Sequence, residues 1–141
     1  MPALNFQRRF VPLIERGEKN QTMRAVGKRT IRPGDKLALY TGQRTKGCQL
    51  IGHTVCTDVS PFQMLTSTRY FALKLPAPEF PALTLLRPLN EAELEDLALH
   101  DGFASADEMF DWFMRQHGRA IEGNIIRWRP LPASLHYLAG R

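Results

Sequence analysis

Apolar residues at the start of the chain have the spacing of one helix face. Between residues 6 and 16 they recur at intervals of four, three and one, at Phe6, Phe10, Leu13 and Ile14. This period predicts a helix with one buried face. Gly17 follows directly, and glycine commonly ends helices because it adopts the left-handed conformation without strain. We therefore expect a helix over residues 6–16 and a polar loop after it.

A β-rich region follows this loop. Pro33 and Gly34 suit the two central positions of a type II turn. Polar and apolar residues then alternate, which is the period of a strand. The proline-rich residues 76–83 are expected to form an exposed, stiff connection. Four strands are expected in all, over residues 36–40, 49–59, 69–75 and 123–131.

Two helices with capping signals lie before the last of these strands. Asn90 is followed three residues later by Glu93, and Ser105 by Glu108. This spacing is that of the capping box, which begins a helix. Gly118 is placed to end the second helix. The order of helix, strands, two helices and strand indicates an α+β fold, as a small β-barrel with flanking helices.

The composition is that of one globular domain. The chain has 141 residues, of which 43% are apolar and 23% are charged; this excludes a disordered chain and allows a sizeable core. No run of about 18 apolar residues is present, and the N-terminus lacks the apolar stretch of a signal peptide. We therefore expect no membrane partner and a cytoplasmic location. Two cysteines, Cys48 and Cys56, agree with a reducing compartment.

Positive charge is concentrated in the first third of the chain. The net charge is +5, and residues 1–50 hold 11 Lys and Arg against 3 acids, whereas residues 87–141 hold 6 against 9. This asymmetry indicates either a polyanionic partner, with nucleic acid as the first candidate, or a solvated basic face that aids solubility. The candidate contacts to a nucleic acid are Lys28, Arg29 and Arg32.

The loop that begins at Gly17 carries side chains that can hold an anion or activate a nucleophile. Its pattern is G-x-K-x-x-T-x-R, with Gly17, Lys19, Thr22 and Arg24. A threonine hydroxyl is a poor nucleophile until a base takes its proton. Lys19 becomes such a base if burial and neighbouring cations lower its pKa from about 10.4 towards neutrality. The alternative is that Lys19 and Arg24 grip phosphate while Thr22 caps a turn.

With these motifs the chain resembles the ASCH domain, a family in the PUA-like superfamily of small β-barrels associated with RNA. The features that carry the resemblance are the apolar helix, G-x-K-x-x-T-x-R, the basic stretch with P-G-D before a strand, D-G-F at 101–103 and I-I-R-W at 125–128. The resemblance implies an ASCH domain with a PUA-like barrel over residues 1–130, followed by a C-terminal tail over residues 131–141.

Some small bacterial members of this family hydrolyse the acetyl amide of 4-acetylcytidine. The resemblance implies Lys19, Thr22 and Asp101 as the catalytic residues, with Asp101 in place of the longer Glu of the characterised hydrolases. The expected function is therefore amide hydrolysis on a modified nucleoside or RNA. Other members of the family are described as ribonucleases or as RNA-binding, so a ribonuclease and a non-catalytic module that recognises a nucleotide in the same pocket are the alternatives.

The remaining expected ligand contacts are Gly17, Arg24 and Arg127. Arg127 lies on the last expected strand and alternates there with Trp128 and then Arg129, so the two arginines can share a face towards the ligand.

A metal site is not expected, although Cys48, His53 and Cys56 lie close together in the sequence. His53 and Cys56 are an odd number of residues apart and would face opposite sides of a strand. We predict no metal and no cofactor, and the oligomeric state stays open. At least two of the three large aromatic residues of the second capped helix are expected to pack in the core: Phe110, Trp112 and Phe113.

Overall fold

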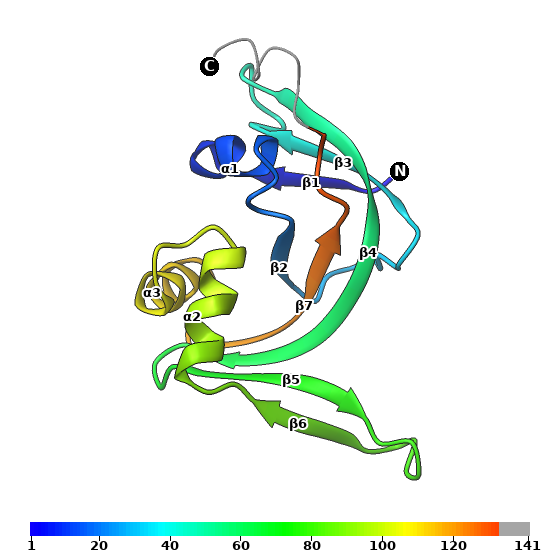
Figure 1. Cartoon of the computed structure of the whole chain (residues 1–141), viewed down its shortest axis with the longest axis vertical. Helices are drawn as coiled ribbons and strands as arrows, with labels where there is room; N and C mark the ends of the chain where they lie inside the picture. Colours follow the sequence, from blue (N-terminus) through cyan, green and yellow to red (C-terminus); the bar gives the residue numbers. More distant parts are fainter. Residues whose placement is uncertain (133–141) are drawn as a thin grey trace.

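The computed structural model describes residues 1–132 and has a mixed α+β architecture (Figure 1). Seven strands form one curved sheet, and the helices lie on the inner side of its curve. The elements in chain order are β1 (Ala3–Phe6), the 3-10 turn η1 (Arg8–Phe10), α1 (Val11–Glu15), β2 (Gln21–Ala25), β3 (Lys36–Thr41), β4 (Gln49–Leu65), β5 (Tyr70–Pro76), β6 (Thr84–Pro88), α2 (Glu91–His100), α3 (Ala106–His117) and β7 (Ala120–Trp128).

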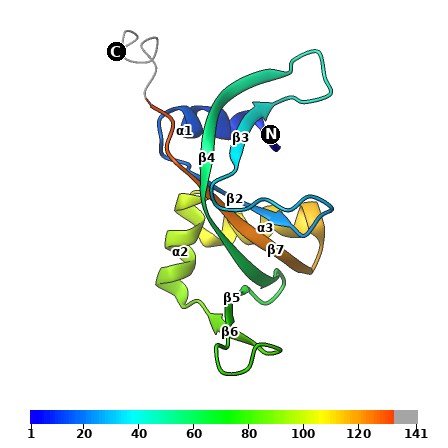
Figure 2. The same ribbon diagram turned by 90° about the vertical axis from the view of Figure 1, so that its right-hand side faces the viewer.

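The long strand β4 connects the two parts of the sheet. Its first part pairs antiparallel with β3, which in turn pairs parallel with β1. Its second part lies between β7 and β5, with β2 next to β7 and β6 next to β5. Figure 2 shows β4 running through most of the height of the molecule. Within residues 1–132, β1, β2 and β6 each pair with a single strand, so the sheet stays open and the expected barrel is not closed.

The core fills the space between the sheet and the helices. Aromatic rings from both sides meet in it; Phe62 of β4 stacks on Phe71 of β5, and Phe103, before α3, contacts Phe113. Phe110 and Phe113 are buried, as predicted, whereas Trp112 is half-buried. No helix within the described part of the chain is both long and apolar enough to cross a membrane.

The prediction of one helix over residues 6–16 was wrong in its first half. Phe6 belongs to β1, and only Val11–Glu15 form an α-helix. Pro12 explains this limit, because proline has no N–H and clashes with the preceding turn, so it is tolerated only in the first turn of a helix. Gly17 has a φ of +75° and reverses the chain as expected. The predicted polar loop ends early, since β2 begins at Gln21.

The expected turn and helix caps are otherwise confirmed, and the last strand, expected over residues 123–131, forms as β7 over Ala120–Trp128. Two further differences lie in the other strands. The prediction ended the second strand at residue 59, but β4 continues to Leu65, and β6 was not predicted within or after the proline-rich connection. Asn90 and Glu93 form a complete capping box. The second box is partial: Ser105 accepts from the N–H of Glu108, while the Glu108 carboxylate accepts from Ala104. Of the predicted tail, residues 133–141 lie outside the described residues.

Candidate functional site

A buried lysine lies at the centre of the candidate site. Lys19 follows the turn after α1, where its backbone N–H donates to the Leu13 carbonyl at 3.0 Å. Only 2% of the residue is exposed. Its Nζ donates to the backbone carbonyl of Asp101 at 2.5 Å and lies 3.6 Å from Asp101 Oδ1. The chain thus brings together two expected catalytic residues that are 82 positions apart.

Aromatic rings surround the Lys19 amine. Nζ lies 4.8 Å from the centre of the Phe10 ring and 5.8 Å from that of Phe6. Burial lowers the pKa of Lys19 below its usual value of 10.5; the Asp101 carboxylate opposes this shift, and repulsion from Arg24 adds to it. A lysine with a lowered pKa can lose its proton near neutral pH and act as a base.

Asp101 caps the C-terminal end of α2 and is buried. Its Oδ1 accepts a hydrogen bond from Gln21 Nε2 at 3.4 Å. Burial raises the pKa of Asp101 above its usual value, whereas the charge of Lys19 and the bond from Gln21 oppose that shift. The carboxyl group is therefore held near the Lys19 amine in an environment that disfavours charge on both groups.

Strand β2 places a hydroxyl and a guanidinium on one face. Thr22 and Arg24 are two residues apart, so their side chains leave the strand on the same side. Arg24 Nε donates to Thr22 Oγ1 at 3.1 Å, and its Nη2 donates to the Asn5 carbonyl at 2.6 Å. The guanidinium lies 4.9 Å from the centre of the Phe6 ring. Because Thr22 Oγ1 accepts from Arg24, its own O–H proton is left to be donated to a base.

These groups line one small cavity of about 190 Å³. Its polar lining includes Lys19, Thr22, Arg24 and Asp101, together with Asn5, Gln7, Gln116 and His117. Its aromatic lining comes from β1, η1, the segment before α3 and α3 itself: Phe6, Phe10, Phe103, Trp112 and Phe113. The cavity therefore combines a flat apolar surface with a cluster of proton-transfer groups.

The other predicted ligand contacts lie outside this small cavity. Gly17 packs near Pro130 on the turn after α1. Arg127 pairs with Asp58 at 2.7 Å. It lines a separate cavity between α2 and the sheet. Arg32 lines none of the cavities named here, and its backbone N–H donates to Asp35 in the turn before β3.

Lys28 and Arg29 belong to the loop between β2 and β3. Both line a larger cavity of about 800 Å³, and Arg24 lines this cavity as well as the small one. The structure therefore joins Lys19, Thr22, Arg24 and Asp101 in one site and places Lys28 and Arg29 next to it.

Three features of the site carry no signal in the sequence. Gln21 holds the Asp101 carboxylate, and Phe6 and Phe10 enclose the Lys19 amine. Phe6 and Phe10 fit a helix face by spacing, and Gln21 is one of several polar residues in its segment. Their roles arise from contacts between elements distant in the chain.

Within residues 1–132 no three His, Cys, Asp or Glu side chains gather in a way that could hold a metal ion. Cys48 is exposed and Cys56 is buried, and both are free thiols.

Comparisons with models of known protein families, with curated proteins and with solved structures find no match for this chain. The resemblance to the ASCH domain therefore rests on the motif residues alone.

Proposed function

We propose that this chain is an ASCH-type amidohydrolase with a PUA-like fold, and that it removes the acetyl group from an acetylated cytidine in the small cavity. The observation that carries the proposal is the buried Lys19 amine, held by Asp101 in the same cavity as the Thr22 hydroxyl. A buried ion pair contributes little to stability on balance. Its position beside a hydroxyl and a guanidinium favours a chemical role.

Each group in the cavity has a step to perform. The neutral Lys19 amine takes the proton of the Thr22 hydroxyl as Oγ1 forms a bond to the acetyl carbonyl carbon. The positive charge of Arg24, which donates to Oγ1, favours the developing alkoxide. The C–N bond then breaks, and the proton held by Lys19 passes to the departing cytosine nitrogen. Water hydrolyses the acetyl ester on Thr22, releasing acetate and restoring the hydroxyl.

Asp101 acts by holding Lys19 in place. Its backbone carbonyl accepts from Nζ at 2.5 Å, and its carboxylate oxygen lies 3.6 Å from the amine, where it favours the protonated form that appears during the cycle. The half-buried Trp112 in the same cavity offers a surface on which a pyrimidine ring can stack.

Hydrolysis of 4-acetylcytidine to cytidine and acetate tests this proposal. Chromatography that separates the two nucleosides measures the turnover. Thr22→Ser keeps a hydroxyl and should retain part of the turnover. Thr22→Val keeps the shape and removes the nucleophile, so turnover should fall by about 10²-fold or more. Equal turnover of Thr22→Val and the wild type would exclude Thr22 as the nucleophile. Absence of turnover on any acetylated cytidine, free or within RNA, would exclude the hydrolase and leave the binding module.

A further inference from the structure

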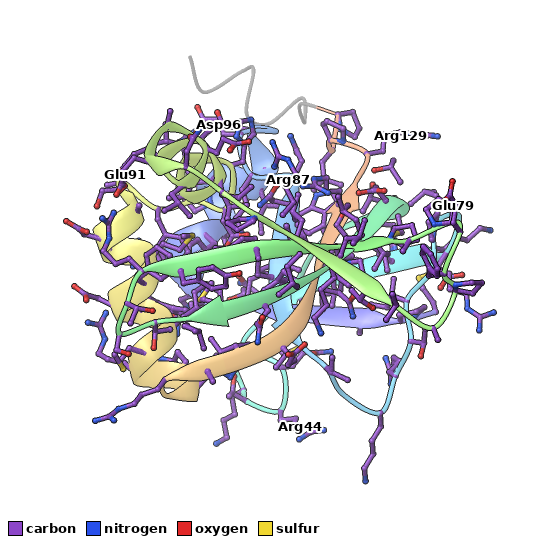
Figure 3. All side chains as sticks on the ribbon, turned by 90° about the horizontal axis from the view of Figure 1, so that it is seen from below. Arg44, Glu79, Arg87, Glu91, Asp96 and Arg129 are labelled. Carbon is purple, nitrogen blue, oxygen red and sulfur yellow. The ribbon has the colours of Figure 1, made fainter. Side chains whose placement is uncertain are left out.

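The large cavity of about 800 Å³ adjoins the proposed catalytic cavity. Its walls come from β1, β2, β3, β4 and β7 and from the loops that follow β2 and β3. These two loops extend from the same side of the molecule in Figures 2 and 3, and Figure 3 labels Arg44 on the second of them. Arg24 and Ala25 line both cavities. A ligand that occupies both would therefore pass Arg24.

The charge of this cavity is of one sign. Arg24, Lys28, Arg29 and Arg44 line it, and its lining includes neither Asp nor Glu. Among the described residues none of these four cations forms an ion pair with a carboxylate, although several other arginines of the chain do so: Arg9, Arg69, Arg87 and Arg127. Four cations without carboxylate partners around one cavity are the arrangement that binds phosphate.

The floor of the cavity is apolar and its size exceeds that of a phosphate group. Leu4, Ile31, Val59 and Ile126 contribute aliphatic surface, and Tyr40 contributes a half-buried ring. Ligand pockets of roughly 300–1,000 Å³ hold whole small molecules. An apolar floor with a cationic rim suits a nucleotide, whose base packs on apolar or aromatic side chains while its phosphate meets the cations.

We propose that the substrate is a single-stranded oligonucleotide, with the nucleotide next to the acetylated cytidine bound in the large cavity. The linking phosphate then lies at Arg24, between the two cavities. This inference rests on the proposed function, because it places the acetylated base in the small cavity. It distinguishes a free nucleoside, which fills one cavity, from a nucleic acid strand, which fills both.

Four substrates separate these possibilities: 4-acetylcytidine, its 3′- and 5′-monophosphates, and an RNA trinucleotide with acetylcytidine at its centre. We expect kcat/KM for the trinucleotide to exceed that for the other three by about tenfold or more at low salt. The advantage should shrink as salt rises, because phosphate contacts release counterions. A monophosphate hydrolysed as efficiently as the trinucleotide would exclude the neighbouring nucleotide from the large cavity.

Two triple variants assign the effect to the cavity. Lys28→Gln/Arg29→Gln/Arg44→Gln removes three of its cations. The matched control, Lys36→Gln/Arg115→Gln/Arg119→Gln, removes three exposed cations that line none of the cavities described above. The first variant should reduce kcat/KM for the trinucleotide by about tenfold more than it reduces that for the nucleoside. The control should retain the wild-type ratio. Thermal unfolding establishes that both variants are folded.

A binding measurement separates this inference from the proposed catalysis. The affinity of a fluorescently labelled, unmodified cytidine-rich RNA oligonucleotide is measured by anisotropy for both triple variants. Weaker binding by the cavity variant than by the control supports the large cavity as the strand site, even in a protein without turnover. Equal affinities of the two variants would contradict the inference, whatever the outcome of the hydrolysis assay.

Discussion

At the scale of single residues, burial of the Lys19 amine costs free energy. The amine is surrounded by Phe6 and Phe10, where removing a charge from water costs several kcal/mol even with a partner nearby. The hydrogen bond to the Asp101 carbonyl and the ion pair with its carboxylate offset part of this desolvation free energy. The pair is therefore expected to weaken the fold relative to an uncharged pair of similar volume, and the proposed mechanism gives it a role in proton transfer.

The pH dependence of stability follows from the same pair. The pKa of Lys19 is lowered in the folded chain, so below 10.5 the unfolded chain binds more protons and stability rises with pH. The pKa of Asp101 is raised, so above 3.8 the folded chain binds more protons and stability falls as pH rises. The double variant Lys19→Met/Asp101→Asn has neither group. The free energy of unfolding of the wild type minus that of this variant should therefore pass through a minimum between these two values.

Urea unfolding from below pH 3.8 to above pH 10.5 measures this difference. A difference that stays constant with pH, or that reaches a maximum in the middle of the range, would show that the two pKa values are not shifted as described.

At the scale of elements, the end of α2 sets the position of the site. Asp101 caps the helix, and Gly102 follows with a φ of +95°, a conformation in which glycine is unstrained. A Cβ at Gly102 would lie 2.9 Å from Phe10 Cδ1 and 3.1 Å from Lys19 Cδ. The close approach of this turn to η1 and Lys19 therefore depends on a residue without a side chain.

Gly102→Ala should be more destabilising than its backbone conformation alone requires. Gly118 is a matched control, because it also ends a helix with a positive φ of 87°, and a Cβ added there would meet no other atom within 4 Å. We expect Gly118→Ala to cost about 1–3 kcal/mol of unfolding free energy from strain, because its φ of 87° and ψ of −151° lie in a region that is essentially restricted to glycine. Gly102→Ala should cost about 1–3 kcal/mol more, from overpacking against Phe10 and Lys19. Denaturant unfolding of both variants measures the costs, and equal losses would contradict the close packing at Gly102.

Helix ends were predictable from the sequence, because a cap is a local arrangement. Asn90 and Glu93 satisfy each other's backbone N–H groups within one turn, and the structure has this box. The first helix was predicted too long because spacing alone placed Phe6 on its face. Pro12 fits only in a first turn, and this information was in the sequence.

The extent of β4 was not predictable from local signals. Ser60 and Pro61 resemble the end of a strand, yet the strand continues past them. Pro61 pairs with Asn124 of β7, while on the other edge the pairing with β3 ends at Val55 and that with β5 begins at Phe62. The missing N–H of Pro61 therefore falls where a neighbouring strand does not require it. This tolerance depends on the sheet as a whole.

The candidate site was predictable in part. The motif and the family resemblance named Lys19, Thr22, Arg24 and Asp101, and the structure brings these four into one cavity. Gln21 belongs to the site because it contacts Asp101, which is distant in the chain. No spacing rule in the sequence indicates this contact.

At the scale of the whole molecule, the core and the β5–β6 hairpin differ in packing. The hairpin extends away from the rest of the sheet (Figure 1), and Leu85 and Leu86 of β6 are about half exposed, at 53% and 47%. Leu39 of β3 is fully buried, at 0%. Leucine side chains in the two regions should therefore contribute very differently to stability.

Leu39→Ala is expected to cost about 2–5 kcal/mol of unfolding free energy, since it leaves a cavity in the core. Leu85→Ala should change stability by about 0.5 kcal/mol or less, because its side chain is exposed. Thermal or urea unfolding of the two variants gives the comparison. A large loss in Leu85→Ala would indicate that the hairpin is covered in solution.

Charge also divides the molecule. The cations of the large cavity come from the first 50 residues, while residues 90–113, which comprise α2, the turn after it and most of α3, hold eight acids and neither Lys nor Arg. Such a distribution would attract a nucleic acid strand, the proposed substrate, to the loops after β2 and β3 and repel it from α2. This distribution gives the proposed substrate one direction of approach to the small cavity.

The proposed mechanism requires Lys19 to act as a base, and Lys19→Arg tests this role. Arginine keeps the positive charge but stays protonated in proteins, so it cannot accept the Thr22 proton. Turnover of the acetylated trinucleotide and affinity for the unmodified RNA oligonucleotide are measured on the same folded variant. We predict a loss of about 10²–10⁴ in kcat with RNA affinity close to that of the wild type. Retained turnover in Lys19→Arg would show that Lys19 is not the base that accepts the Thr22 proton.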